Sequence, residues 1–101
     1  MSEAATLRSA GDGRFALTGA LTLATVAALR TQGRHAYAGT AGDIVVDMGG
    51  VERADSGGLA LLVDWLAWAK AAGRKLTFTA LPEALRSLAR VSDVEDLLAE
   101  S

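Results

Sequence analysis

The segment from Ser56 to Ala72 constrains the fold most, because it predicts a long helix that is apolar around most of its circumference. Only Asp64 and Lys70 carry charge within the helix body. At about 100° per residue, the larger side chains form two stripes. The first comprises Leu59, Leu62, Val63, Leu66 and Ala69, and the second comprises Leu61, Trp65, Trp68 and Ala72. Such a helix must be covered on two sides. We expect a sheet beneath the first stripe and either a neighbouring helix or a protein partner over the second, with the tryptophans slightly favouring a partner.

Three stretches of sequence predict strands around this helix. Residues 5–9 and 14–18 flank Gly11-Asp12-Gly13, a turn sequence typical of a β-hairpin, and we expect Gly19 to end the second strand. The apolar run from Ile44 to Met48 is typical of an interior strand. We expect Gly49-Gly50 to end that strand and residues 51–54 to form a connection. Residues 75–79 alternate as a half-buried strand does.

Helix signals lie between these strands. Thr22 is placed to cap a first helix with a stripe of Leu23, Val26, Ala27 and Arg30, and we expect this helix to fray through residues 32–34. Gly73 should end the long helix in a left-handed conformation. Pro82 is expected at the first position of a further helix. A last turn or two, from Val94 to Leu98, should pack back on the body.

The predicted order of elements is β-β-α-β-α-β-α, followed by a short final helix. Strand–helix–strand connections of this length imply parallel pairing with right-handed crossovers, and the hairpin adds one antiparallel strand. The fold class is therefore α/β, with a mixed, mostly parallel β-sheet whose helices pack mainly on one face.

Composition limits the classes of function. The chain has 101 residues, a net charge of −2 and no cysteine, so we expect one domain over residues 1–101, without disulfides or thiolate metal sites. The charge balance gives no basic footprint for nucleic acid. Met1–Ala4 shows no start of a signal peptide, and no apolar run approaches the length of a membrane span. We expect a cytoplasmic domain.

The sequence offers little for catalysis. His35 is the only histidine, and we expect it to be exposed in a poorly structured stretch after the first helix. The phosphate-binding glycine patterns are absent. Asp43, Asp47 and Asp55 could gather at a strand end as a magnesium site or a phosphoacceptor pocket, but solvated strand-end and cap carboxylates are the simpler interpretation. We therefore expect no enzyme, no cofactor and no metal.

The most informative motif is Asp55-Ser56-Gly57-Gly58-Leu59, at the start of the long helix. Asp or Ser at this point can accept hydrogen bonds from unpaired backbone N–H groups. Two glycines in the first turn are harder to explain, since each costs about 0.5–1 kcal/mol relative to alanine. Close approach of another surface to the backbone would explain them. A plain helix cap and a functional surface both remain open on spacing alone.

Nearly the whole chain resembles a STAS domain, the fold of bacterial anti-sigma-factor antagonists and of sulfate-transporter tails. The segment Val51-Glu52-Arg53-Ala54-Asp55-Ser56-Gly57-Gly58-Leu59-Ala60-Leu61-Leu62 carries the most specific part of the resemblance. In the antagonists the motif usually reads Asp-Ser-Ser-Gly-Leu, and the first serine is phosphorylated by a partner kinase. That resemblance implies Ser56 as the equivalent, phosphorylatable position.

Gly57 in place of the second serine makes the motif more similar to the MlaB branch of the family. That resemblance implies a non-catalytic cytoplasmic subunit that binds the MlaF-like ATPase of a phospholipid-transport ABC complex, together with permease and substrate-binding subunits. The pathway maintains outer-membrane lipid asymmetry, and the domain would be peripheral to the inner membrane. We expect the partner-binding residues to be Asp55, Ser56, Gly57, Gly58, Leu61 and Trp65. The alternatives are an anti-sigma antagonist that binds a serine kinase and, less favoured, a domain that holds a nucleotide or acyl chain itself.

Overall fold

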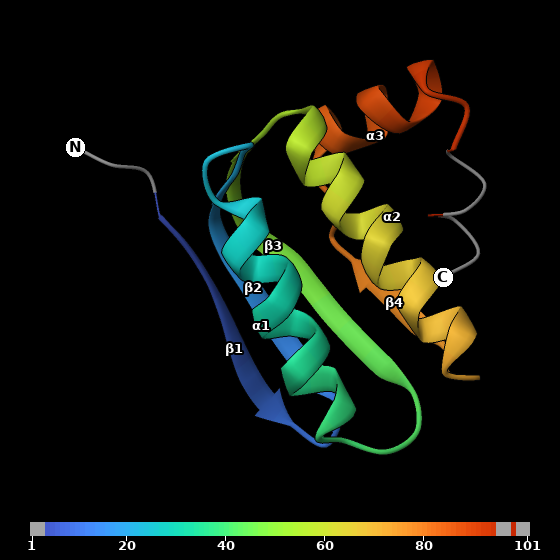
Figure 1. Cartoon of the computed structure of the whole chain (residues 1–101). Helices are drawn as coiled ribbons and strands as arrows, with labels where there is room; N and C mark the ends of the chain where they lie inside the picture. The colour runs from blue at the N-terminus through green and yellow to red at the C-terminus, as the bar shows by residue number, and fades with distance from the viewer. Residues whose placement is uncertain (1–3, 95–97, 99–101) are drawn as a thin grey trace.

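The computed structural model describes residues 4–94 and residue 98, and shows four strands and three helices in these residues (Figure 1). In chain order the elements are β1 Ala5–Gly11, β2 Arg14–Leu21, α1 Val26–Ala38, β3 Ile44–Ala54, α2 Ser56–Ala71, β4 Leu76–Thr79 and α3 Glu83–Val91. The described elements therefore follow the order that the sequence predicts, up to the final short helix.

The strands form one mixed sheet in the order β1-β2-β3-β4. β1 pairs with β2 antiparallel, whereas β2–β3 and β3–β4 are parallel pairs, as expected. At the hairpin turn, Asp12 and Gly13 both have positive φ, 28° and 78°. Positive φ at both central residues matches the twist of the flanking strands, which explains the Asp-Gly sequence.

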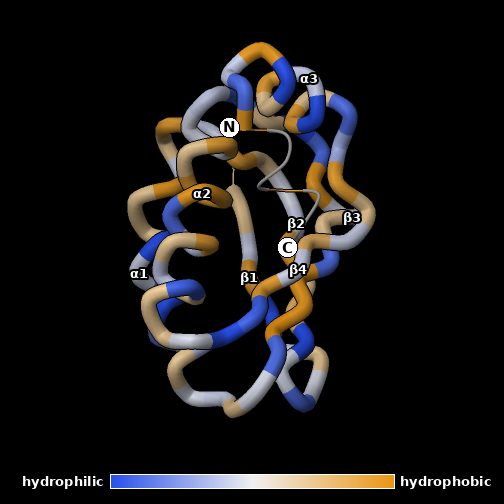
Figure 2. The backbone as a smooth tube through the Cα atoms, turned by 90° about the vertical axis from the view of Figure 1, so that its right-hand side faces the viewer, coloured by the Kyte–Doolittle hydropathy of each residue, from blue (hydrophilic) through white to orange (hydrophobic). Residues whose placement is uncertain are grey.

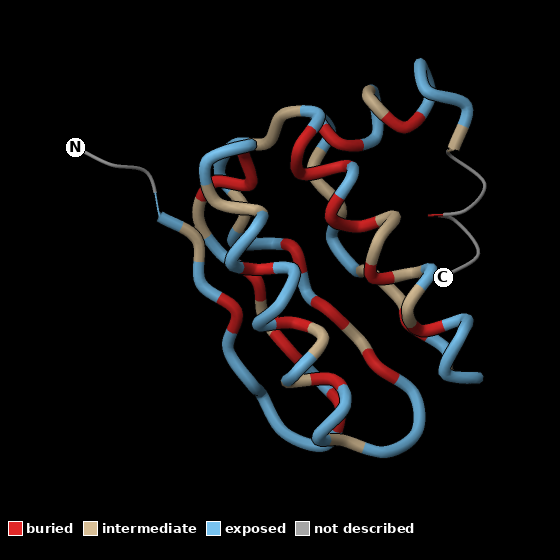
Figure 3. Tube along the Cα trace, in the orientation of Figure 1, coloured by how far each residue is buried: buried red, intermediate tan, exposed pale blue. Residues whose placement is uncertain are grey.

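The helices α1 and α2 lie on the same side of the sheet (Figure 2). Leu17, Val46 and Leu76, on three successive strands, are buried. Buried and less buried positions alternate along β2 and the start of β3 (Figure 3). The other face carries the exposed residues Thr6, Arg8, Thr18, Asp47 and Thr79. This division of the sheet into an apolar and a polar face confirms that the helices cover mainly one side.

Two strands are longer than the sequence suggests. Gly19 does not end β2: it has φ 95° inside the strand, and an added Cβ would collide with the carbonyl oxygen of Ala4. Gly49-Gly50 likewise lies within β3, which continues through the expected connection to Ala54. The β2–β3 register shifts between Ala16 and Thr18 and again between Gly19 and Ala20, and Thr18 faces Gly50. At these positions glycine accommodates strand irregularity and close strand contact rather than ending the strand.

The predictions for α1 need correction in three respects. The helix begins at Val26 rather than at Thr22, which lies in the preceding turn. Its buried face comprises Leu29, Gly33 and Tyr37, not the stripe that began with the exposed Leu23. The helix also continues unbroken to Ala38, because Gly33 packs directly against α2: a Cβ there would lie 2.5 Å from ring carbons of Trp65.

The helix α2 has the two covers that its composition requires. Leu59 and Leu62 of the first stripe are buried, and Val63 and Leu66 are half-buried against the core. On the second stripe, Leu61 and Trp65 are buried and Trp68 is half-buried, whereas Ala72 is exposed. Trp65 packs on Gly33 of α1. A neighbouring helix of the same domain therefore covers much of the second stripe.

The helix ends after α2 partly follow the sequence signals. Gly73 has φ 69° and the Arg74 N–H donates to the Ala69 carbonyl at 2.8 Å, as expected for a left-handed helix end. Pro82 is the N-cap of α3 rather than its first helical residue. Of the predicted final turns, Leu98 is buried in the core, whereas residues 95–97 lie outside the described part of the chain.

Truncation of Leu62 tests this packing. Its side chain is 0% exposed, so Leu62→Ala should lower the free energy of unfolding by about 2–5 kcal/mol. Leu23→Ala, the same chemical change at a side chain in solvent, should change it by less than about 0.5 kcal/mol. Urea unfolding of both variants measures the difference. Equal, small effects would contradict the burial of Leu62 on the core-facing side of α2.

Candidate functional site

The motif at the start of α2 lies beside the turn that follows β2. β2 and β3 are parallel neighbours, and Leu21 at the end of one is in register with Ala54 at the end of the other. The Asp55 N–H donates to the Leu21 carbonyl at 3.0 Å and extends this pairing beyond the strands. The β2–α1 turn and the first turn of α2 therefore meet at one end of the sheet (Figure 1).

Asp55 joins these two segments through both oxygens of its carboxylate. Oδ1 accepts a hydrogen bond from the Gly57 N–H at 2.8 Å and thereby caps α2. Oδ2 accepts one from the Leu23 N–H at 3.3 Å, across 32 positions of sequence. The positive end of the helix dipole favours the negative charge at this position. Asp55 is thus a cap, as one interpretation of the motif predicts, and also a tie between two surface segments.

The β2–α1 turn is further held by its two threonines. The Thr25 hydroxyl donates to the Ala20 carbonyl at 2.7 Å and accepts from the Thr22 N–H at 3.0 Å. The Thr22 hydroxyl accepts from the Ala24 N–H at 3.3 Å. These bonds, with that from Leu23 to Asp55, fix the turn that carries Leu23.

The paired glycines allow the helix to approach this turn. A Cβ on Gly57 would lie 2.9 Å from the Leu23 backbone nitrogen and 2.9 Å from Leu23 Cδ2. A Cβ on Gly58 would lie 2.9 Å from both the carbonyl oxygen and the Cβ of Leu21. The surface that approaches the glycines is thus another segment of the same chain. Their cost in helix propensity is offset by contact between α2 and the end of β2.

Ser56 is the first residue of α2 and is exposed. Ala60 follows one helical turn later and is also exposed. Across the Asp55 tie, Leu23 and Ala24 are exposed on the β2–α1 turn. We call these four residues, Leu23, Ala24, Ser56 and Ala60, the α2-entry face. It presents one hydroxyl and three apolar side chains.

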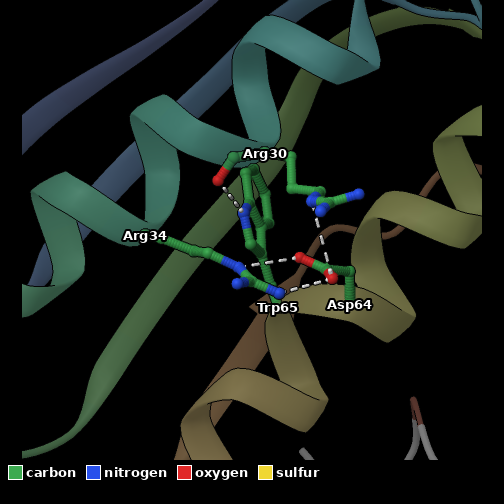
Figure 4. A network of polar contacts seen from close by, with 4 residues as sticks. All are labelled: Arg30, Arg34, Asp64 and Trp65. Atoms are coloured by element: carbon green, nitrogen blue, oxygen red, sulfur yellow. Dashed lines mark hydrogen bonds and ion pairs between the residues drawn. The ribbon is translucent and has the colours of Figure 1, made fainter.

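Leu61 and Trp65 lie inside the domain rather than on this face. Trp65 is 0% exposed, and its indole Nε1–H donates to the Arg30 carbonyl at 3.4 Å (Figure 4). Beside it, Arg34 makes a two-point ion pair with Asp64, with N···O distances of 2.6 and 3.1 Å. These contacts join α1 to α2, so Leu61 and Trp65 support the α2-entry face through packing and not through exposed surface of their own.

A buried phenol was not anticipated from the sequence. The ring of Tyr37 packs edge-on against Phe15 and Trp65, at centroid distances of 5.0 and 5.2 Å. Its hydroxyl is buried and has no hydrogen-bond partner among the described residues. Burial raises the pKa of Tyr37 above the ordinary value of a phenol, so the ring stays neutral. Leu29, Gly33 and Tyr37 follow one another at intervals of four residues, on one face of the helix. This spacing is the sequence signal that could have predicted the burial of Tyr37.

The other polar candidates have local structural contacts or are exposed. His35 is exposed, as expected, but lies on the ordered helix α1. Asp47 accepts from the Gly49 N–H at 2.8 Å, while Asp55 caps α2. Within residues 4–94 and 98, no set of three His, Cys, Asp or Glu side chains is arranged to bind a metal ion. Among these residues, no helix is both long enough and apolar enough to span a membrane.

Comparisons with known proteins agree with this architecture. Residues 5–99 match the family described as Mlab, STAS domain. A solved structure, the anti-sigma factor antagonist SpoIIAA in its unphosphorylated form, superimposes with a TM-score of 0.66 and 17% sequence identity. The match covers 86% of this chain and 82% of that one. A comparison with curated proteins finds no match.

Replacement of a motif glycine tests the close approach of α2 to β2. In an ordinary helix Gly→Ala is stabilising, but Gly58→Ala should destabilise this domain by about 1–3 kcal/mol, because the new Cβ meets the Leu21 backbone. Gly39→Ala is the control, since its Cβ would meet only ordinary contacts, the nearest at 3.5 Å. Thermal unfolding compares the two variants. A Gly58→Ala domain as stable as the wild type would contradict the contact.

Proposed function

Because the chain belongs to the STAS domain family, we propose that it is a non-catalytic subunit that binds the ATPase of a phospholipid-transport ABC complex. One observation carries this proposal most directly. The motif that resembles the MlaB branch opens α2 with an exposed Ser56, next to an exposed leucine on a fixed turn. The proposal treats residues 1–101 as a single STAS domain.

The chemistry of the α2-entry face suits recognition of a protein. A hydroxyl and small apolar side chains surround a helix start whose cap is satisfied internally by Asp55. Protein interfaces combine such an apolar centre with a few hydrogen bonds. Ser56 would contact the partner directly. Asp55, Gly57 and Gly58 would shape the face, and Leu61 and Trp65 would support it from inside.

The ATPase is proposed as the partner because the MlaB-like motif and the family match point to the same branch. In this proposal the domain acts in the cytoplasm, peripheral to the inner membrane, within a complex that also holds permease and substrate-binding subunits. Binding to the folded ATPase would stabilise that subunit or change its turnover. The domain itself would bind no cofactor and no nucleic acid.

An anti-sigma-factor antagonist remains the second candidate. Ser56 is exposed at the helix start, where a kinase could reach it, and the fold is similar to that of the antagonist SpoIIAA. A phosphate at this position would add about −1.5 to −2 charge at pH 7. The helix N-terminus would favour that charge and Asp55 would oppose it. The partner in this case would be an anti-sigma serine kinase.

Substitution of Ser56 separates contact with the partner from simple capping. Ser56→Asp should abolish binding to the ATPase, because an interface that fits a neutral hydroxyl would bury an unpaired charge at a cost of about 3–5 kcal/mol. Ser56→Thr keeps the hydroxyl and should bind. Both variants should melt close to the wild type, since the side chain is exposed. Co-purification with the ATPase, alongside thermal melts, measures this.

Two outcomes would change the assignment. Equal capture of the ATPase by the wild type, Ser56→Thr and Ser56→Asp would remove Ser56 from the interface. Capture of a serine-kinase homologue by the wild type, with no binding to the ATPase, would favour the antagonist function.

A further inference from the structure

Two large hydrophobic side chains are exposed among the described residues, Leu23 (73%) and Val91 (86%). Val91 is the last residue of α3, where a helix end commonly reaches solvent. Leu23 instead lies on the β2–α1 turn, with its Cδ2 close to the position that a Cβ of Gly57 would occupy. Its exposed side chain is therefore continuous with the start of α2.

The turn holds Leu23 in this exposed position. The Leu23 N–H is bonded to Asp55 Oδ2, and the adjacent Thr22 is bonded to Thr25 through its own N–H. These hydrogen bonds restrain the backbone at Leu23, so its side chain projects from a fixed position on the surface. A turn whose backbone is fixed before binding loses less conformational entropy when a partner covers it.

Charge around Leu23 identifies the kind of partner. No residue from Phe15 to Leu29 is charged, and none from Ser56 to Val63. Asp55 lies between these segments, with each of its carboxylate oxygens already bonded to a backbone N–H. An anionic membrane surface or a nucleic acid is bound by clusters of lysine and arginine, and these two segments contain none, although Arg53 lies on β3 in register with Ala20. A neutral, apolar face is complementary to an uncharged apolar depression on a protein.

We propose that Leu23 is the apolar anchor of the partner interface, inserting into an uncharged, apolar depression of the protein that contacts Ser56. This inference rests on the proposed function, in which that protein is the ABC ATPase. Asp55 then acts as a positioning residue, because it fixes the anchor on one side and the Ser56 turn on the other. Buried apolar anchors at the centre of an interface supply much of its binding energy.

The test measures the dissociation constant between the purified domain and its purified ATPase. Leu23→Ala should weaken binding by about tenfold or more, and Leu23→Asp should abolish it. Leu23→Met, which keeps the apolar volume, should bind within a few-fold of the wild type. The matched controls Val91→Ala and Val91→Asp change the other exposed hydrophobic residue and should leave binding unchanged.

The possible failures are distinguishable. A wild-type domain that does not bind the ATPase would overturn the proposed function and this inference with it. Wild-type binding that is equally strong in Leu23→Asp would overturn the anchor alone. Sedimentation and vesicle flotation on the same proteins test whether Leu23 instead contacts a second copy of the domain or a membrane surface. Self-association, or binding to vesicles of anionic phospholipid, that is lost in Leu23→Asp but kept in Val91→Asp would also overturn it.

Discussion

The candidate site depends on the two hydrogen bonds that the carboxylate of Asp55 accepts. Its two oxygens accept from the N–H groups of Gly57 and Leu23, which belong to segments far apart in sequence. The first bond starts α2, and the second holds the β2–α1 turn against it. Hydrogen bonds of Thr22 and Thr25 hold the turn internally, and the bond to Asp55 holds it beside the helix start. Together the two segments present Leu23 and Ser56 on one face.

A second set of contacts fixes the direction of α2 beneath this face. Trp65 lies on Gly33 of α1, where even a methyl group would clash, and Arg34 pairs with Asp64 on the outer side of the same crossing. Tyr37 fills the space between these helices and the sheet residue Phe15. The helix start is therefore supported from within by close-packed aromatic side chains. Dense packing of this kind resists displacement.

The sequence predicts the element order and the sheet topology because hydrophobic periodicity and turn residues are local signals. It predicts glycine roles less well. Gly19 and Gly50 look like strand ends, yet they sit inside strands. Ala4, just before β1, approaches Gly19, and Thr18 of β2 approaches Gly50. The same limit applies to Trp65, whose partner Gly33 lies on another helix. At the site, Asp55 and Ser56 are identifiable from the motif. Leu23 is not, because tertiary contacts bring its turn to the helix: the bond to Asp55 and the close approach of Gly57.

The central claim is that one carboxylate joins the two halves of the site, and Asp55→Asn tests it most directly. Asparagine keeps an oxygen that can cap α2, but it replaces the second acceptor with an amide donor. Amide hydrogen exchange, read residue by residue by NMR, should show the Leu23 amide losing about tenfold or more in protection, while the Gly57 amide stays protected. Leu23 protection equal to that of the wild type would contradict the claim.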